Sequence, residues 1–324
     1  MSKVVSPSWI FTIPLHGVRL LQSVETDRLD CNGEYIESLK LSFSECFVPT
    51  QQKPIWRLST QGERYSSIVK LFDETIGKLL HIECQGTGSF QYLGNEINVA
   101  WQDEGTSFEH YLQTVGLSLW LEMRGVLCIH ANAIETERGV IGIIAPSQTG
   151  KTTLTAALAV RSMGMMSDDM MAIHKTTEGL KVFPGWPQVR MWPEVAQHFV
   201  RDIETLQRVH HRFEKRIVES GTQNELRFSN KSGQLKRLYL LDRTDDSNDS
   251  EIRIEQLSAS ESMIVLLQNS MLADAYRSLN VEKDRLDRLA SMLESVEIKR
   301  ITYPSGKEHL VNICKSIEAD VKTI

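Results

Sequence analysis

A short segment near the middle of the chain combines the residue types that bind phosphate groups. Residues Ala145 to Thr152 read Ala-Pro-Ser-Gln-Thr-Gly-Lys-Thr, which fits the phosphate-loop pattern with alanine in place of the first glycine. The apolar stretch Val140 to Ile144 precedes the segment, and strong helix formers follow it from Lys151 to Arg161. A strand that enters the loop and a helix that leaves it would direct backbone N–H groups and the positive end of the helix dipole at phosphates.

The loop predicts a site for ATP and Mg²⁺. We expect Lys151 to reach the β- and γ-phosphates and Thr152 to bind the metal ion. Pro146 has no N–H to donate, and Ala145 and Gln148 lack glycine's freedom at positive φ, so phosphate binding must rest on the later part of the loop. The residues expected to bind the nucleotide are Ser147, Gln148, Thr149, Gly150, Lys151, Thr152 and Thr153. A Gly-Lys-Thr helix start without a ligand is the alternative.

Two adjacent carboxylates, Asp168 and Asp169, interrupt the apolar run Met165 to Ile173. Unpaired carboxylates are costly to bury, so they require a cation, a hydrogen-bond network or a cavity. In an extended backbone they point to opposite faces, and we then expect one to serve a reacting hydroxyl or the metal and the other a neighbouring group. An exposed turn between two short strands is the alternative.

A histidine lies in the apolar segment before the loop. His130 falls within Val126 to Ile134, which we predict to be one strand beside the phosphate-loop strand. A hydrogen-bonded core histidine and a catalytic histidine are both compatible with this pattern.

Composition restricts the class of protein. The 324 residues are 41% hydrophobic, which is enough for a large core. The net charge is −6, and basic and acidic residues are mixed along the chain. The sequence therefore shows no concentration of positive charge of the kind that binds nucleic acid or an anionic membrane. The five scattered cysteines form no C-x-x-C pair, and the N-terminus lacks a signal-peptide pattern. We therefore expect a cytoplasmic protein with reduced thiols.

The pattern of elements changes near residue 107. Before it, short segments with β-type spacing predict a small β-rich N-terminal domain, residues 1–107, with strands such as Leu79 to Cys84, Ser89 to Leu93 and Glu96 to Trp101. Apolar residues from Ser107 to Arg124 follow a helical period that ends at Gly125. The strand, loop, helix and strand that follow predict an α/β catalytic domain over residues 108–324.

The C-terminal part continues with predicted strands and helices. The strands are Arg237 to Asp242 and Glu251 to Leu257, and the helices are Glu261 to Ala273 and Ser305 to Val321. The charged segment Arg201 to Arg237 has few apolar anchors, so we predict a mobile loop that closes over the substrates. A passive surface insertion is the alternative.

Several of these features together resemble the HPr serine kinase/phosphorylase family, in particular its shorter relatives found with lasso-peptide and other modified-peptide (RiPP) biosynthesis. The resemblance covers roughly residues 108 to 313. The features that carry it are Ile129-His130-Ala131-Asn132-Ala133, the loop itself, Leu154 to Leu158, Ser167-Asp168-Asp169, Phe183 to Pro187, Val189 to Pro193 and Leu238 to Arg243.

The resemblance implies a serine kinase with a core similar to that of phosphoenolpyruvate carboxykinase. It implies that Asp168 takes the proton from the accepting serine, that Asp169 helps with metal or substrate, and that His130 lies near the transferred phosphoryl group. Arg190 is the candidate arginine that joins Lys151 in neutralising developing charge.

The implied acceptor is a serine of a ribosomally made precursor peptide. Two alternatives stay open: an HPr-type kinase that acts on a folded carrier protein, and a nucleotide-binding switch without catalysis. The glycine-rich segment that follows the aspartates in true HPr kinases is not seen, which argues against HPr as the substrate. The base preference of the nucleotide and the oligomeric state, including a homo-oligomer, also stay open.

Overall fold

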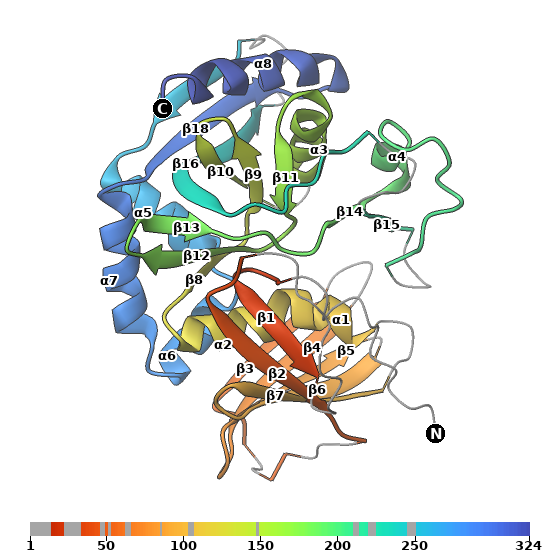
Figure 1. Cartoon of the computed structure of the whole chain (residues 1–324), viewed down its shortest axis with the longest axis vertical. Coiled ribbons are helices and arrows are strands. Elements are labelled where there is room, and N and C mark those ends of the chain that lie inside the picture. The colour runs from red at the N-terminus through yellow and green to blue at the C-terminus, as the bar shows by residue number, and fades with distance from the viewer. Residues whose placement is uncertain are drawn as a thin grey trace.

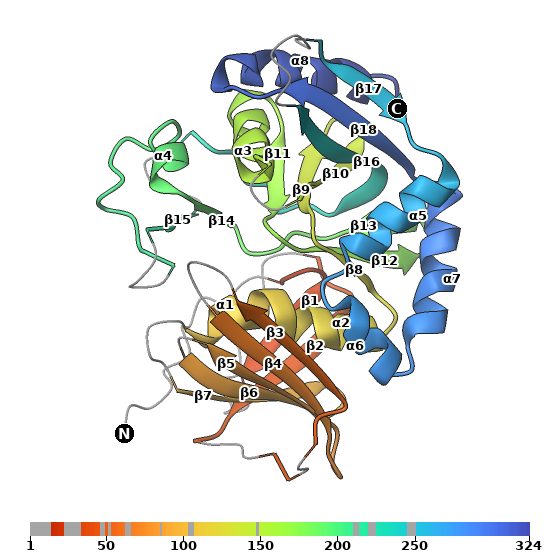
Figure 2. The same cartoon turned by 180° about the vertical axis from the view of Figure 1, so that it is seen from behind.

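The computed structural model describes most of the chain as two sheets with helices packed on them (Figures 1 and 2). The described residues are 14–22, 34–45, 49–50, 53–61, 66–84, 86–102, 107–146, 149–209, 214–219, 225–244 and 251–324. Among them, no helix is long and apolar enough to cross a membrane.

The N-terminal sheet contains seven strands within the described ranges, in the spatial order β1-β2-β7-β6-β5-β4-β3. Its strands are β1 (Val18–Gln22), β2 (Glu37–Phe43), β3 (Trp56–Gln61), β4 (Ser66–Asp73), β5 (Lys78–Cys84), β6 (Gly86–Tyr92) and β7 (Glu96–Gln102). The last three confirm the strands predicted from the alternation of apolar residues. The division of the chain at residue 107 stays a prediction.

The predicted helix after residue 107 is present in three successive segments. They are α1 (Phe108–Tyr111), the π-helical turn η2 (Leu112–Gly116) and α2 (Leu117–Met123). Gly125, with φ 85°, follows the C-terminus of α2, as the glycine signal predicted. Leu112 and Trp120 share one hydrophobic cluster with Phe90 and Trp101 of the sheet, so this helix covers the side of the N-terminal sheet that faces the rest of the protein (Figure 1).

The second sheet contains nine strands among the described residues. They are β8 (Leu127–Ile129), β9 (Asn132–Thr136), β10 (Gly139–Ile144), β11 (Gly164–Ser167), β12 (Met171–Thr176), β13 (Gly179–Val182), β16 (Gly233–Thr244), β17 (Arg253–Gln256) and β18 (Glu297–Pro304). One row of paired strands runs β11-β9-β10-β16-β18-β17. Strand β16 also pairs with β13, and from there a second row continues to β12 and β8. The central strands β10, β16 and β18 are parallel.

Helices cover both faces of this sheet. The helices of the C-terminal part are α3 (Lys151–Arg161), α4 (Pro193–Ala196), α5 (Ala259–Gln268), α6 (Ala273–Ser278), α7 (Glu282–Leu293), the 3₁₀ turn η3 (Lys307–His309) and α8 (Leu310–Val321). Ile141 and Tyr239 pack with α3 and α8, while Val140 and Leu238 pack with α5 and α7. Neighbouring residues of the same strand therefore pack against helices on opposite faces of the sheet. The core is a helix–sheet–helix arrangement, which confirms the mixed α/β class.

Two expectations about individual segments are wrong. The predicted strand Val126 to Ile134 is two strands, because the chain changes partner at His130: β8 pairs with β12, whereas β9 pairs with β10 and β11. The segment Arg201 to Arg237 is not one long loop. Its described parts include β15 (Arg216–Glu219), which pairs with β14 (Gln188–Met191), and the first residues of β16. Residues 210–213 and 220–224 lie outside the described residues, and the predicted closure stays a prediction.

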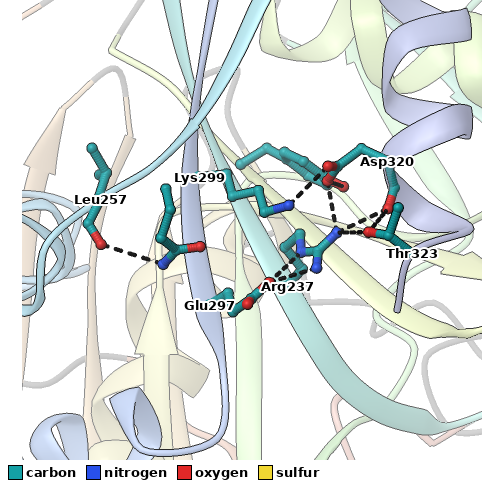
Figure 3. A network of polar contacts seen from close by, with 8 residues as sticks. Arg237, Leu257, Glu297, Lys299, Asp320 and Thr323 are labelled. Atoms are coloured by element: carbon teal, nitrogen blue, oxygen red, sulfur yellow. Dashed lines mark hydrogen bonds and ion pairs between the residues drawn. The ribbon is translucent and has the colours of Figure 1, made fainter.

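A polar network fastens α8 to the central strands (Figure 3). Asp320 on α8 accepts hydrogen bonds from Arg237 Nη1 at 2.7 Å and from Tyr239 Oη at 2.7 Å. Lys299 Nζ on β18 donates to the other carboxylate oxygen at 2.8 Å, and Glu297 pairs with the far side of the Arg237 guanidinium. Burial alone would raise the pKa of Asp320, but the bonds from Lys299 and Tyr239 and the Arg237 charge outweigh it and lower that pKa.

We predict that Asp320→Asn destabilises the protein at neutral pH by about 1–3 kcal/mol, because it leaves Arg237 and Lys299 without their charged acceptor. A lowered folded-state pKa gives stability that is present above the unfolded value, about 3.9, and is lost as the pH falls through the lowered value. Chemical denaturation from pH 7 to pH 3 should therefore show a weaker acid dependence in the variant. The exposed Asp287→Asn is the control, and identical curves for Asp320→Asn and wild type would contradict the prediction.

Candidate active site

Most of the candidate residues come together at one edge of the sheet, where β10 and β11 end and the antiparallel β9 between them begins. Ile143 at the end of β10 is opposite Asn132 at the start of the antiparallel β9, and Ser167 at the end of β11 is opposite Ala133. The phosphate loop leaves from β10, the two aspartates follow β11, and His130 precedes β9. In open α/β sheets, ligands bind outside such strand ends.

The segment predicted to be a phosphate loop lies between β10 and α3, so the predicted strand and helix on either side of it are present. Phosphate binding by this segment stays a prediction. The Thr149 hydroxyl donates to the Pro146 carbonyl at 2.7 Å, and Tyr303 Oη donates to the Thr149 carbonyl at 2.8 Å. Gly150 caps α3 with φ 97°, a left-handed conformation that favours glycine. The predicted ligands Ser147 and Gln148 lie outside the described residues. Thr152 and Thr153 are half-buried in the first turn of α3.

Lys151 places a buried ammonium group beside the aspartates. Its side chain is 9% exposed, and Nζ lies 3.5 Å from Asp169 Oδ1. Nζ has no hydrogen-bond partner among the described residues. Burial lowers the pKa of Lys151, although the charges of Asp169 and Asp168 oppose this shift. The ammonium therefore keeps N–H donors available for an anionic ligand.

Asp169 lies in a turn and not in an extended strand. Its φ is 63°, so the extended backbone that would point the two aspartates to opposite faces is not present. The pair lies in a turn between β11 and β12, as in the alternative, but Asp168 is only 4% exposed, so the turn is not an exposed one. The Asp169 backbone N–H donates to Asn132 Oδ1 at 2.9 Å, and Asn132 Nδ2 donates to Thr155 Oγ1 at 3.1 Å. Thr155 in turn donates to the Lys151 carbonyl at 2.8 Å. The fully buried Asn132 thus ties the aspartate turn to the first turn of α3.

Three basic side chains surround the Asp169 carboxylate. Arg190 Nη2 donates to Oδ2 at 3.1 Å, and Lys151 Nζ and His130 Nε2 lie 3.5 and 3.6 Å from Oδ1. Burial alone would raise the pKa of Asp169. The His130 contact and the charges of Arg190 and Lys151 outweigh burial and hold that pKa well below its usual value. Asp169 is therefore ionised and fixed in place.

Asp168 has a different environment although it is adjacent in sequence. Its side chain is 4% exposed, and Oδ2 accepts a hydrogen bond from the Arg190 backbone N–H at 3.0 Å. Oδ1 is buried and has no hydrogen-bond partner in the described part of the chain. Burial raises the pKa of Asp168, and the negative charge of Asp169 raises it further. A buried carboxylate with a raised pKa and an unused oxygen is suited to accept a proton.

Arg190 holds both aspartates from the small β14–β15 sheet. It is 5% exposed, and its guanidinium contacts the two carboxylates and His110 Nδ1, the last at 2.8 Å. Because arginine can only donate, His110 Nδ1 must be the acceptor and carries no proton in this contact. As placed, Arg190 positions the aspartates. Its predicted contact with developing phosphate charge stays a prediction.

The structure thus brings together Asp168, Asp169, Lys151, Arg190 and His130, of which only His130 is largely exposed. In the described ranges, no group of three or more His, Cys, Asp or Glu side chains could hold a metal ion by itself. Sequence reasoning assigned no role to Asn132, Thr155 or His110. The position of Asn132 inside an apolar segment could have indicated that its side chain has a role in the site. Nothing in the local sequence indicated a role for His110.

Comparison with known proteins gives little further guidance. No protein-family model matches the chain, and no curated protein matches its sequence. The solved structures that it resembles include the Hpr(Ser) kinase/phosphatase from Coxiella burnetii, with 15% sequence identity and a TM-score of 0.31 over 60% of this chain and 89% of that chain. A likeness this low carries no argument about function.

We predict that Gly150→Ala weakens both folding and nucleotide binding. A Cβ at φ 97° costs about 1–2 kcal/mol, although the nearest side-chain atom, Tyr303 Oη, is 4.0 Å away. Gly179→Ala is the matched control, because Gly179, the first residue of β13, has φ 113° and open space around it. Thermal unfolding should show similar losses in both variants. Calorimetry should show weaker binding of a non-hydrolysable ATP analogue only in Gly150→Ala, and wild-type affinity there would contradict the loop assignment.

Proposed function

We propose that this protein is an ATP- and Mg²⁺-dependent kinase that transfers the γ-phosphoryl group to a serine hydroxyl of a ribosomally made precursor peptide. The observation that supports it most is Asp168: a buried carboxylate with a raised pKa and one unused oxygen, at the same sheet edge as the N-terminus of α3. A purely structural acid has no need of an unsatisfied oxygen in this position, since such an atom costs about 1–3 kcal/mol.

The residues of the site divide into those that bind the nucleotide and those that act on the acceptor. The N–H groups of the first turn of α3 and the Lys151 ammonium bind the phosphates. The first N–H groups of a helix have no carbonyl partner one turn earlier, and Lys151 Nζ has no hydrogen-bond partner among the described residues. Asp168 orients the acceptor hydroxyl and takes its proton. Asp169 contacts Lys151 and Arg190 and so keeps both basic side chains close to Asp168. The half-exposed His130 lies next to Asp169.

Thr152 and Asp169 are the proposed ligands of Mg²⁺, which would supply charge neutralisation at the phosphates. Magnesium is commonly held by one or two protein oxygens together with phosphates and waters, so a cluster of three acidic ligands is not required. Asp169 Oδ1 lies 3.5 Å from Lys151 Nζ and 3.6 Å from His130 Nε2, so neither basic group holds that oxygen at the usual hydrogen-bond distance.

The identity of the acceptor rests on the family resemblance of the sequence. An HPr-type kinase of a folded carrier protein would use the same residues and is the alternative within this chemistry. A nucleotide-binding switch without catalysis is disfavoured, because it gains nothing from a buried Asp168 and a half-buried Asp169 beside its nucleotide.

We predict that Lys151→Ala reduces phosphoryl transfer by at least about a hundredfold, because the ammonium stabilises phosphate charge where water cannot replace it. Transfer from labelled ATP to a degenerate pool of serine-containing peptides is the measurement, with binding of a non-hydrolysable ATP analogue as a second readout. Lys175→Ala, which changes an exposed lysine on β12, should behave as wild type. Full activity and full nucleotide affinity in Lys151→Ala would overturn the proposed nucleotide site.

We predict that Asp168→Asn keeps nucleotide affinity within about tenfold of wild type and lowers turnover by about a hundredfold or more, as loss of a general base should. The wild-type pH profile provides a second check. The basic form is required, and the raised pKa means that protonation occurs at higher pH, so activity should fall on acidification at a pH above the usual carboxylate value of about 3.9. Normal turnover in the variant, or no acid-side decline in wild type, would contradict Asp168 as the base.

A further inference from the structure

One face of the β14–β15 ribbon is directed at the two aspartates. Strands β14 and β15 form a two-stranded antiparallel ribbon beside α3 and α4 (Figure 1). Arg190 on β14 is directly opposite Ile217 on β15, so their side chains lie on the same face of the ribbon. Because Arg190 contacts both Asp168 and Asp169, this face adjoins the site. Other side chains on this face are therefore candidate members of the site.

The half-buried Lys215, which immediately precedes β15, lies on this face. Its carbonyl accepts a hydrogen bond from the Val209 N–H at 3.0 Å. The Ile217 N–H donates to the Gln207 carbonyl at 2.8 Å, so the same neighbouring segment pairs with both residues and the backbone between them is extended. Side chains of an extended backbone alternate between two faces, which places Lys215 on the same face as Ile217 and Arg190.

The basic residues on the other face of the ribbon already have an acidic partner. Arg216 is 4% exposed, and its guanidinium donates to the Glu214 carbonyl oxygen at 2.7 Å. The Glu214 carboxylate lies 3.4 Å from Arg216 Nη2 and 2.9 Å from Arg208 Nη1. The acidic residue next to Lys215 is thus shared by two arginines. Within the described residues, the Lys215 ammonium itself forms neither an ion pair nor a hydrogen bond.

The positive charge of Lys215 acts on the groups of the site. Burial has the largest effect on the pKa values of Asp168, Asp169 and Lys151, and the Lys215 charge acts on all three as well. It lowers the pKa of both aspartates by attraction and that of Lys151 by repulsion. These effects agree with the register of the ribbon, which directs Lys215 toward the site.

The charges of the site are not balanced. When all five groups are ionised, the three cations Lys151, Arg190 and Lys215 face only two carboxylates, those of Asp168 and Asp169, and one positive charge is left over. An excess of like charge in a partly buried site is costly unless a ligand of opposite charge binds there. The imbalance therefore indicates an anionic ligand.

Lys215 and Lys151 approach this ligand from different elements. Lys151 belongs to the first turn of α3, whereas Lys215 comes from the ribbon. Arg190 is already bonded to an aspartate and to His110, so Lys215 is the ribbon's uncommitted cation among the described residues of the site-facing side. In phosphoryl transfer, negative charge is spread over three equatorial oxygens of the γ-phosphoryl group, and cations from two elements can contact different oxygens.

We propose that Lys215 is a further catalytic residue of the kinase proposed above and that its ammonium contacts the γ-phosphoryl group of ATP. The inference rests on the proposed function. The acceptor oxygen forms its bond to the γ-phosphorus, the bond from phosphorus to the bridging oxygen breaks, ADP leaves with that electron pair, and Asp168 takes the acceptor proton. Lys215 neutralises part of the negative charge on the γ-phosphoryl oxygens during this step. It lies outside the segments that carry the family resemblance, which does not imply this role.

Calorimetry with Mg²⁺ and either ADP or a non-hydrolysable ATP analogue separates a γ-phosphoryl contact from general nucleotide binding. In Lys215→Ala we expect affinity for the analogue to fall about tenfold, because a charge-assisted contact is lost, and affinity for ADP to stay within about twofold of wild type. Turnover of labelled ATP with the serine-containing peptide pool should fall about a hundredfold, since the contact is strongest in the transition state. Lys215→Arg keeps the charge and should stay within about threefold of wild type for both nucleotides.

The control variant is Lys231→Ala, which changes an exposed lysine before β16 and should bind both nucleotides as wild type does. Retained ADP binding also shows that Lys215→Ala is folded. Unchanged analogue affinity together with unchanged turnover in Lys215→Ala, or an equal loss of affinity for ADP and the analogue, would overturn the contact and leave the proposed kinase function standing. Failure of wild type to bind either nucleotide would overturn the proposed function itself.

Discussion

The arrangement of the site depends on one ionised side chain, the carboxylate of Asp169. The Asp169 side chain is only 26% exposed, and a charge that is largely removed from water is stable only when cations and hydrogen-bond donors surround it. Arg190 from β14, Lys151 from α3 and His130 from the β8–β9 connection provide these contacts. A strand, a helix and the connection between two strands are therefore held at one carboxylate. The left-handed turn at Asp169 makes this possible, and the Asn132 side chain holds that turn.

The same arrangement shifts the pKa values of the two adjacent aspartates in opposite directions. The positive groups are closest to Asp169 and lower its pKa, whereas Asp168 is buried with only one oxygen hydrogen-bonded and has a raised pKa. Two titratable groups whose pKa values are moved apart are the usual basis for distinct acid–base roles within one site. Arg190 contacts both carboxylates, so the charge that stabilises Asp169 also fixes the position of Asp168.

The helical segment after residue 107 contributes directly to this group of residues. His110 accepts a hydrogen bond from Arg190, and Gln113 accepts one from Gln188, so this segment contacts the first and third residues of β14. The helix itself packs on the N-terminal sheet in one hydrophobic cluster with Met170 and Trp186, which adjoin the site. A change in the position of this helix would therefore move Arg190 and, through it, both aspartates. The packing of the N-terminal sheet is part of the geometry of the site.

The sequence predicted the parts of this site that local pattern determines. The loop, the helix Lys151–Arg161 and the strand before the loop follow from apolar runs and glycine position, and the carboxylates were found because they interrupt an apolar run. The break at His130 was missed, because both halves of the segment are equally apolar and only the change of strand partner separates them. Helix α7 was missed because its charged residues obscure the buried positions Arg285, Leu289 and Met292. His110 reaches the site only through a contact between segments far apart in the chain, and no local periodicity encodes such a contact. A site assembled from several elements is therefore predicted best at its loop and least at the residues that close it.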